Sequence, residues 1–159
     1  MKILLLGLSG SGKTTIAKEI SSRFSLNLYE ADDEVKRING GVWPESDDVV
    51  TKGFEIANAK ALIQDDIVYV ISWLSEEEIN KFLKSNFIIF ETHAEFDELV
   101  RRKIERDKIT PEKIEKFKLT YIEYFNTILN RDMVEKYRMS IDTTNLTKYN
   151  LFKIIIDNL

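Results

Sequence analysis

The chain has 159 residues, of which 43% are hydrophobic and 31% are charged, and its formal net charge is −4. This size accommodates one domain with a substantial core. The absence of cysteine excludes disulfides and thiol nucleophiles, and a single histidine, His93, excludes a histidine metal cluster. The negative charge argues against a protein that mainly coats nucleic acid, although it allows a local basic groove.

The apolar runs of the sequence are too short to span a bilayer. Among the longest is Ile67 to Ile71, whereas a membrane-spanning helix needs about 20 apolar residues. The N-terminus passes from Lys2 directly into an apolar segment, without the features of a signal peptide. We therefore expect a cytoplasmic protein with no membrane partner.

A phosphate-binding motif occupies residues 7 to 14, which read Gly-Leu-Ser-Gly-Ser-Gly-Lys-Thr and satisfy the pattern G-x-x-x-x-G-K-[ST]. The apolar run Lys2 to Leu6 precedes it and predicts a strand buried on both faces. Residues 15 to 23 follow with helical spacing of their apolar side chains. Strand, loop and helix therefore stand in the order that this motif requires.

The motif assigns roles to individual residues. Lys13 reaches the β- and γ-phosphates of a nucleotide, and the Thr14 hydroxyl ligates Mg2+. Glycines let backbone N–H groups approach the phosphate oxygens closely, and the helix N-terminus adds positive potential. The predicted nucleotide contacts in this loop are Gly7, Ser9, Gly10, Ser11, Gly12, Lys13, Thr14 and Thr15.

An acidic cluster follows the second predicted strand, Leu26 to Tyr29. Ligands of open parallel sheets bind beyond the carboxyl ends of the strands, so Asp32 is expected to face the mouth that the phosphate loop lines. One carboxylate there can accept the proton of an attacking hydroxyl and help to hold Mg2+. Asp32 is the first candidate for both roles, and Asp33 and Glu30 are alternatives for the base. An acidic helix start without catalytic function would produce the same cluster.

Gly40 to Pro44 interrupts the periodicity and predicts a loop on the substrate side. Trp43 in this loop could stack on a base or close over a substrate, although a tryptophan that caps the core is as common. Asp48 to Gln64 predicts a helix, and Ile67 to Ile71 predicts a third strand. The predicted substrate-binding residues are Asp32, Asp33, Trp43 and Ser72.

The next helix has a clear start signal. Ser75, with Glu78 three residues later, forms a capping box that predicts a helix to about Lys84. Phe87 to Phe90 predicts a fourth buried strand, and Glu91-Thr92-His93 follows at its exit.

Phe96 to Arg106 predicts a helix with Phe96, Leu99, Val100 and Ile104 directed inward. Arg102 and Arg106 lie four residues apart, so both can point at one phosphate. A solvated basic face is the alternative interpretation.

Thr110 and Pro111 predict the start of a helix, whose apolar stripe through Tyr121, Ile122 and Phe125 indicates packing. Residues 138 to 141 predict a fifth strand, and residues 147 to 158 predict a closing helix. The alternation of five short strands with helices predicts a three-layer α/β/α P-loop NTPase fold of the nucleoside-monophosphate-kinase type, with a five-stranded parallel sheet in one domain, residues 1 to 159.

Other nucleotide-binding classes lack support in the sequence. The Asn-Lys-x-Asp and Asp-x-x-Gly motifs of switch GTPases do not occur, and the strand Ile67 to Ile71 ends in Ser72 rather than in the acid of motor-type ATPases. The small size and the arginine-bearing helix favour a kinase, in which arginines on a mobile segment neutralise the transferring group.

Residues 7 to 17, which continue the motif with Thr-Ile-Ala, resemble the start of adenylylsulfate kinases, typically GLSG-[AS]-GK-[ST]-T-[IV]-A. Glu30-Ala31-Asp32 stands where that family has Asp-Gly-Asp, and Val70-Ile71-Ser72 resembles its Phe-Ile-Ser. Glu91-Thr92 resembles its Asp-Thr, whereas its proline after Ile-Ser is Trp73 here and its lid signature is absent. The resemblance implies a hydroxyl kinase for adenylylsulfate or another nucleotide-linked acceptor, such as cytidine diphosphoramidate.

Residues 99 to 107 followed by residues 109 to 114 are similar to phage-type polynucleotide kinases and to the archaeal kinase of seryl-tRNA. In those proteins an Arg-x-x-x-Arg helix precedes a short lid and a proline-led helix, which places the lid here at about residues 102 to 112. They also carry Asp-Asp after the second strand, which supports Asp32 as the base. This resemblance implies that Arg102 and Arg106 stabilise the transferring phosphoryl group.

We therefore expect a kinase that uses ATP and Mg2+ to phosphorylate a hydroxyl of a small, nucleotide-like metabolite. Residues 142 to 145 lie where such kinases keep the loop near adenine, which assigns Thr144 and Asn145 to the nucleotide. A polynucleotide or tRNA hydroxyl kinase is one alternative, and a nucleotide-binding regulator without turnover is another. A homodimer is compatible with the sequence.

Overall fold

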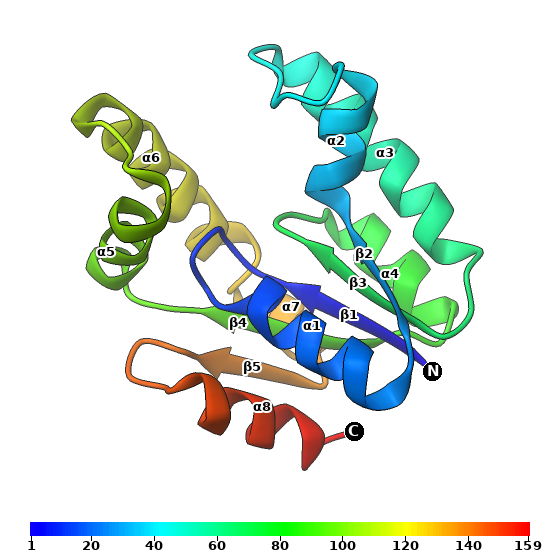
Figure 1. Ribbon diagram of the computed structural model, residues 1–159. Coiled ribbons are helices and arrows are strands. Elements are labelled where there is room, and N and C mark those ends of the chain that lie inside the picture. Colours follow the sequence, from blue (N-terminus) through cyan, green and yellow to red (C-terminus); the bar gives the residue numbers. More distant parts are fainter.

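The computed structural model describes the backbone of residues 1 to 159 and every side chain except that of Arg131. Its centre is a parallel sheet with the strand order β2-β3-β1-β4-β5 (Figure 1). Parallel neighbours need crossover connections, and helices supply them here. The strands are Lys2–Leu6 (β1), Asn27–Glu30 (β2), Ile67–Ile71 (β3), Ile88–His93 (β4) and Met139–Asp142 (β5).

Helices lie on both faces of the sheet and confirm the predicted three-layer α/β/α fold with a five-stranded parallel sheet. None of the described helices is long and apolar enough to cross a membrane. The helices are Lys13–Phe24 (α1), Ala31–Ile38 (α2), Asp47–Leu62 (α3), Glu76–Lys84 (α4), Phe96–Asp107 (α5), Pro111–Thr127 (α6), Arg131–Val134 (α7) and Lys148–Ile156 (α8).

Alternate residues of the strands enter two separate cores, because successive side chains of a strand point to opposite faces. Ile3 and Leu5 of β1 pack with apolar residues of α1 and α8. Leu4 and Leu6 pack with α3, α4 and α6 on the other face. Every residue of β3 is buried, as expected for an internal strand of a parallel sheet.

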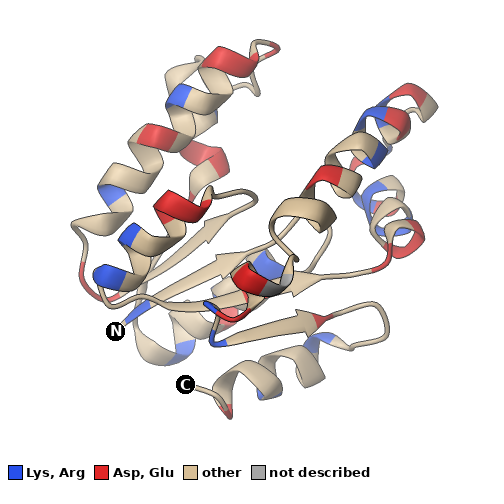
Figure 2. Ribbon diagram, turned by 180° about the vertical axis from the view of Figure 1, so that it is seen from behind, with Lys and Arg blue, Asp and Glu red and all other residues tan. Residues whose placement is uncertain are grey.

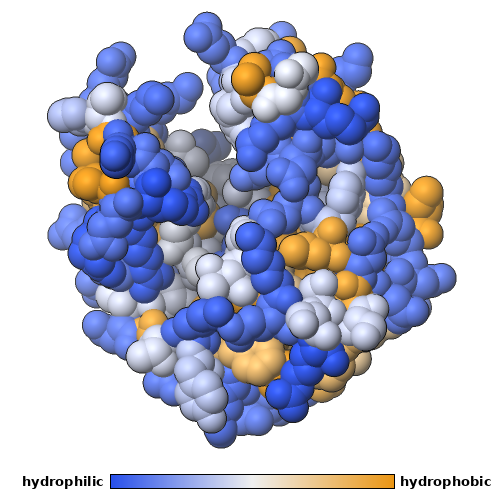
Figure 3. Space-filling view, in the orientation of Figure 1, coloured by the Kyte–Doolittle hydropathy of each residue, from blue (hydrophilic) through white to orange (hydrophobic). Residues whose placement is uncertain are grey.

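Two helical arms rise beyond the carboxyl ends of the strands, one formed by α2 and α3 and the other by α5 and α6 (Figure 1). Figure 3 shows a hollow between them. Basic and acidic residues are interspersed along both arms (Figure 2). The arms therefore border the edge of the sheet at which parallel α/β folds bind ligands.

A buried carboxylate holds the first arm together. Glu34 on α2 is 4% exposed and accepts hydrogen bonds from Arg37 at 2.5 Å and from Lys60 on α3 at 3.0 Å. Tyr29 at the end of β2 donates a third hydrogen bond to it at 3.1 Å. Close packing of α2 on α3 also requires Gly53, since a Cβ there would lie 2.7 Å from a methyl group of Val35. These contacts hold α2 against α3 in the first arm.

Several element boundaries differ from the prediction. Helix α1 begins at Lys13 rather than near Thr15, and β4 continues to His93 rather than ending at Phe90. The longer β4 results from pairing with β5, where Thr92 lies opposite Ile141. The short helix α7 was not predicted from the sequence.

The second arm exposes apolar residues that were predicted to pack. Ile104 on α5 is 45% exposed, and Ile122 and Phe125 on α6 are 47% and 49% exposed. The inner side of the arm is aromatic, with the Phe96 ring stacked at 6.1 Å from Phe117. Helix α6 therefore has a narrower packed face than its sequence indicates, because it contacts the body along one side only.

Candidate functional site

The phosphate loop connects β1 to α1 at the centre of the sheet. Gly7 has a φ of 153°, and a Cβ at this position would lie 2.2 Å from the Thr92 carbonyl oxygen of β4. The Ser11 hydroxyl is buried and lies 2.8 Å from the Thr92 hydroxyl. The loop is therefore pressed against the adjacent strand, and only glycine fits at its first position.

A cleft of about 920 Å³ opens above the loop. One wall comes from the β2–α2 junction, another from α5, and a third from the segment between β5 and α8. All predicted nucleotide contacts except Gly7 line it, and Gly7 lies beneath them in contact with β4. The structure thus collects residues from four distant segments of the chain: Ser9, Gly10, Ser11, Gly12, Lys13, Thr14, Thr15, Asp32, Asp33, Arg102, Arg106, Thr144 and Asn145.

Lys13 is the buried cation of this cleft. Its side chain is 7% exposed, and its ammonium group donates to the Leu8 carbonyl oxygen at 3.3 Å. Burial lowers the pKa of Lys13 to about 8, although the negative charge of Asp32 partly opposes the shift. An anion bound beside Lys13 would stabilise the charged form of the lysine.

Three carboxylates at the β2–α2 junction have different partners. Glu30 accepts a hydrogen bond from the Thr14 hydroxyl at 3.1 Å, and Asp33 lies 3.7 Å from the Lys36 ammonium group. Asp32 is partly buried and accepts no hydrogen bond from the described residues. The sequence ranked Asp32 first and kept Asp33 and Glu30 as alternatives, and the structure gives each of the three different contacts.

The oxygen groups near Thr14 fit a magnesium ion. Mg2+ prefers oxygen ligands and usually takes only one or two from the protein, with the others from phosphates and water. The Thr14 hydroxyl and the carboxylates of Glu30 and Asp32 supply such groups on one wall. The described residues contain no cluster of three or more His, Cys, Asp or Glu side chains that could hold a metal alone.

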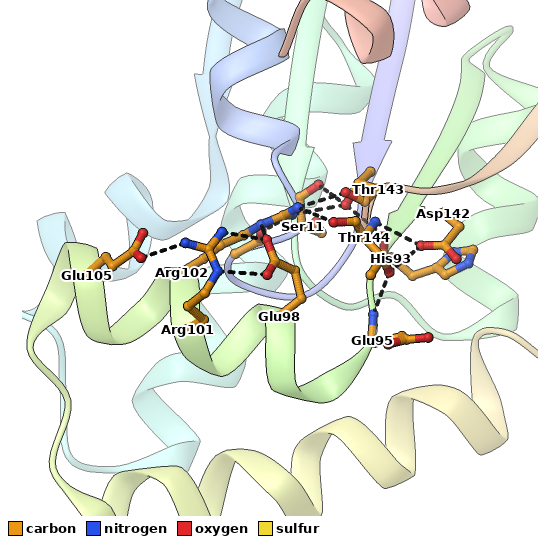
Figure 4. A network of polar contacts seen from close by, with 11 residues as sticks. Ser11, His93, Glu95, Glu98, Arg101, Arg102, Glu105, Asp142, Thr143 and Thr144 are labelled. Atoms are coloured by element: carbon orange, nitrogen blue, oxygen red, sulfur yellow. Dashed lines mark hydrogen bonds and ion pairs between the residues drawn. The ribbon is translucent and has the colours of Figure 1, made fainter. Parts of the chain in front are cut away.

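Arg102 connects the phosphate loop to the segment after β5 (Figure 4). Its guanidinium donates to the Gly10 carbonyl oxygen at 3.0 Å and to the Thr143 carbonyl oxygen at 2.7 Å. Glu98, one turn earlier on α5, accepts from its Nε at 2.7 Å. In this conformation Arg102 therefore contacts protein groups on several sides instead of pointing freely at a phosphate.

Arg106 is the more available of the two predicted arginines. It donates to the Ser9 hydroxyl at 2.9 Å and pairs with Asp107, while 58% of its side chain is exposed. Its guanidinium lies close enough to Lys13 to affect the pKa of that lysine. The two arginines thus both contact the phosphate loop, Arg102 at Gly10 and the more exposed Arg106 at Ser9.

Two of the predicted substrate-binding residues lie outside the cleft lining. Trp43 is at the tip of the first arm, 47% exposed, with its ring in edge contact with Phe54 at 6.4 Å. Ser72 follows β3 and is partly buried. Their roles stay predictions, because this conformation brings neither residue to the described cleft.

The sequence analysis gave no individual role to two buried polar residues, Thr143 in the cleft lining and Glu91 on β4. Thr143 is 2% exposed, and its hydroxyl donates to the carbonyl oxygens of His93 and Ser11. Glu91 is fully buried and accepts from Tyr124 at 2.8 Å and Ser140 at 2.6 Å. The available sequence signal was a carboxylate and a threonine next to apolar strands. Their roles could not be predicted because their hydrogen-bond partners are distant in the sequence.

Comparisons with known proteins support the fold. No protein-family model matches the chain, and no curated protein matches it. Three solved structures illustrate the likeness found. A shikimate kinase from Acinetobacter baumannii in complex with shikimate is 20% identical with a TM-score of 0.75, covering 98% of this chain and 90% of that one.

A gluconokinase from Sinorhizobium meliloti 1021 is 17% identical with a TM-score of 0.71, covering 99% of this chain and 90% of that one. A shikimate kinase from Bacteroides thetaiotaomicron is 11% identical with a TM-score of 0.77, covering 99% and 95%. At these identities the comparison shows that the chain has the P-loop fold that small-molecule kinases also use.

Proposed function

We propose that this chain is an ATP- and Mg2+-dependent kinase that phosphorylates a hydroxyl group of a small molecule. The observation that carries the proposal is that Lys13 of the phosphate loop and Asp32 of the β2–α2 junction line the same cleft. A phosphoryl donor bound by the loop and a hydroxyl bound by the carboxylate would meet between them. The fold shared with shikimate kinase and gluconokinase structures supports a small acceptor.

Asp32 is the proposed general base. Its carboxylate accepts no hydrogen bond from the described residues, so it is available to a substrate hydroxyl. Glu30 is engaged by the Thr14 hydroxyl, and Asp33 is directed toward Lys36. Glu30 therefore orients Thr14 on the metal-binding wall, and Asp33 contributes to the acceptor side.

Lys13, Thr14 and the loop N–H groups bind the nucleotide phosphates. Mg2+, when bound, supplies charge neutralisation on the β- and γ-phosphates. Thr14 offers it a hydroxyl oxygen, and Asp32 and Glu30 offer carboxylate oxygens from the same wall. Thr144 and Asn145 also line the cleft, where they would contact the adenine.

The two arginines have different proposed roles. Arg106 reaches Ser9 at the start of the loop and stabilises the transferring phosphoryl group by its charge. Arg102 holds Gly10 and Thr143 in place and so aligns the phosphate loop with the adenine segment. The short segment from α5 to α6, within residues 102 to 112, acts as the lid.

The acceptor class is tested directly by acceptor-dependent ADP release from ATP and Mg2+. The panel contains shikimate, gluconate, adenylylsulfate, cytidine diphosphoramidate, nucleosides and a 5′-hydroxyl oligonucleotide, and Lys13→Ala is the control. We expect one small acceptor to stimulate ADP release, and the stimulation to vanish in the control. Stimulation by a nucleotide-linked acceptor would support the adenylylsulfate-kinase-like specificity within this proposal.

Two other outcomes would redirect the proposal. Stimulation by the oligonucleotide alone, with an affinity that falls steeply as salt rises, would indicate a polynucleotide kinase. ATP binding without turnover of any acceptor would favour a nucleotide-binding regulator.

A further inference from the structure

Lys103 on α5 is a partly buried cation whose ion pair with Asp107 is long. Its side chain is 16% exposed, and no hydrogen bond to its ammonium group is found among the described residues. Its ion-pair partner Asp107 lies 3.9 Å away. That carboxylate already accepts two hydrogen bonds from Arg106, at 2.6 and 2.5 Å. The three N–H donors of Lys103 therefore lack protein acceptors.

Lys103 faces a different side of α5 from the two arginines. Arg102 and Arg106 line the nucleotide cleft, whereas Lys103 is not part of that lining. The ammonium group of Lys103 lies over the Phe117 ring of α6, 4.8 Å from its centroid. Lys103 therefore lies at the border between the P-loop side of α5 and the inner, aromatic side of the second arm.

The charge of Lys103 interacts with charged groups of the proposed active site. Burial lowers its pKa, while Asp107 and Asp32 oppose that shift. Lys103 is also close enough to lower the pKa of Lys13. Lys103 is a partly desolvated ammonium 3.9 Å from Asp107, which lines the cleft, so an anion that binds at this border of the cleft would stabilise it.

Nearby cations of the first arm are already paired. Arg37 and Lys60 are bound to Glu34, and Lys36 is directed toward Asp33. Lys103, whose ion pair is longer than these and whose partner is shared with Arg106, can receive a further anionic group. Its aromatic neighbour helps to hold the ammonium in position through a cation–π contact.

We infer that Lys103 binds an anionic group of the phosphoryl acceptor, either a carboxylate or a phosphate, and so selects acidic hydroxyl compounds over neutral ones. This inference rests on the proposed kinase function. Lys103 then determines acceptor specificity, while Lys13 and the phosphate loop bind the nucleotide phosphates.

The test is anion binding to protein whose loop is filled with Mg2+ and a non-hydrolysable ATP analogue. Inorganic phosphate and gluconate are titrated separately by calorimetry, so the two arms distinguish phosphate from carboxylate. Lys103→Gln removes the charge, Lys103→Arg retains it, and Lys118→Gln removes an exposed lysine of α6 as the matched control. Circular dichroism checks the folding of each variant.

We expect Lys103→Gln to weaken binding of at least one anion by roughly tenfold or more, since a charge-assisted hydrogen bond is lost. Lys103→Arg and Lys118→Gln should bind like the unmodified protein. Affinity for the ATP analogue should be the same in all four proteins. Once an acceptor is known, Lys103→Gln should raise its KM far more than it lowers kcat.

Three results would overturn the inference: no binding of either anion by the unmodified protein, equal weakening in Lys103→Gln and Lys118→Gln, or loss of affinity for the ATP analogue in Lys103→Gln alone. The last would move Lys103 to the nucleotide phosphates. The kinase proposal is judged separately by ADP release. Anion binding through Lys103 without turnover of any acceptor would refute the kinase and leave the anion site intact.

Discussion

Replacement of Lys13 by methionine tests how strongly the cleft is prepared for an anion. The lysine is 7% exposed, and burial lowers its pKa from 10.5 to about 8. Methionine has a similar length and carries no charge, so Lys13→Met removes the titration while filling much of the same space. The variant should also lose nucleotide binding, because the phosphates lose their cation.

The size of the stability effect follows from the pKa. Between pH 8 and 10.5 the unfolded chain keeps the proton on Lys13 while the folded chain has lost it. Stability rises with pH wherever the unfolded state binds more protons, so the unmodified protein gains stability across this window. The change from 10.5 to about 8 corresponds to roughly 3 kcal/mol. Lys13→Met lacks this gain.

Urea unfolding followed by circular dichroism measures the free energy of unfolding of both proteins from pH 7 to 11. Other lysines and the tyrosines titrate in both proteins, so their contributions cancel in the difference. We expect the stability of Lys13→Met relative to the unmodified protein to be greatest near pH 7 and to fall by roughly 3 kcal/mol by pH 11. A difference that stays constant with pH would refute the argument, because Lys13 would then titrate normally.

Three further predictions address the base, the arginines and the first arm. Asp32→Asn should lower kcat by about 10² to 10⁴-fold with ATP affinity retained, measured as acceptor-dependent ADP release; equal loss on changing the neighbouring aspartate would contradict the assignment. Arg102→Met should lower the free energy of unfolding by roughly 2 kcal/mol, because its hydrogen bonds are lost. Arg106→Met should change the free energy of unfolding by no more than about 0.5 kcal/mol but should lower kcat by about a hundredfold. Urea unfolding and steady-state kinetics measure the two effects, and the reverse pattern would exchange the roles of the two arginines. The hydrogen bond from Arg37 lowers the pKa of Glu34 to about 2, so this carboxylate stabilises the fold above pH 4.5 and loses that effect as pH falls from 4.5 to 2. Glu34→Gln should therefore cost roughly 2 kcal/mol at neutral pH and flatten the acid-unfolding curve in that window; an unchanged acid slope would show that the ion pairs contribute little.

The local patterns of the sequence were sufficient for the fold class and for the phosphate loop. The capping box at Ser75 and Glu78 is confirmed by reciprocal hydrogen bonds. The apolar runs became the strands of a parallel sheet, and the loop between β1 and α1 has the geometry that its glycines require. These features depend on residues within a few positions of one another, so a single sequence contains them.

The sequence ranked Asp32 first but did not separate the two alternative acids from each other. It offered three acids after β2, and only their contacts separate Glu30, bound to Thr14, from Asp33, paired with Lys36. It also gave the two arginines one shared role in stabilising the transferring phosphoryl group. In the structure Arg102 instead donates to the Gly10 carbonyl oxygen, 92 residues away in the chain. Equal side chains at equal spacing receive different roles from their surroundings.

What the sequence alone determined was the strand-loop-helix unit that binds phosphate and the alternation that produces a three-layer sheet. Only the tertiary structure decided the extension of β4 to His93, the burial of Glu91 and the position of Lys103 over Phe117. The physical reason is that strand order and the direction of each arm decide which distant side chains meet. Burial and hydrogen-bonded partners then shift the pKa values of these side chains, and the spacing of residues along the chain predicts neither.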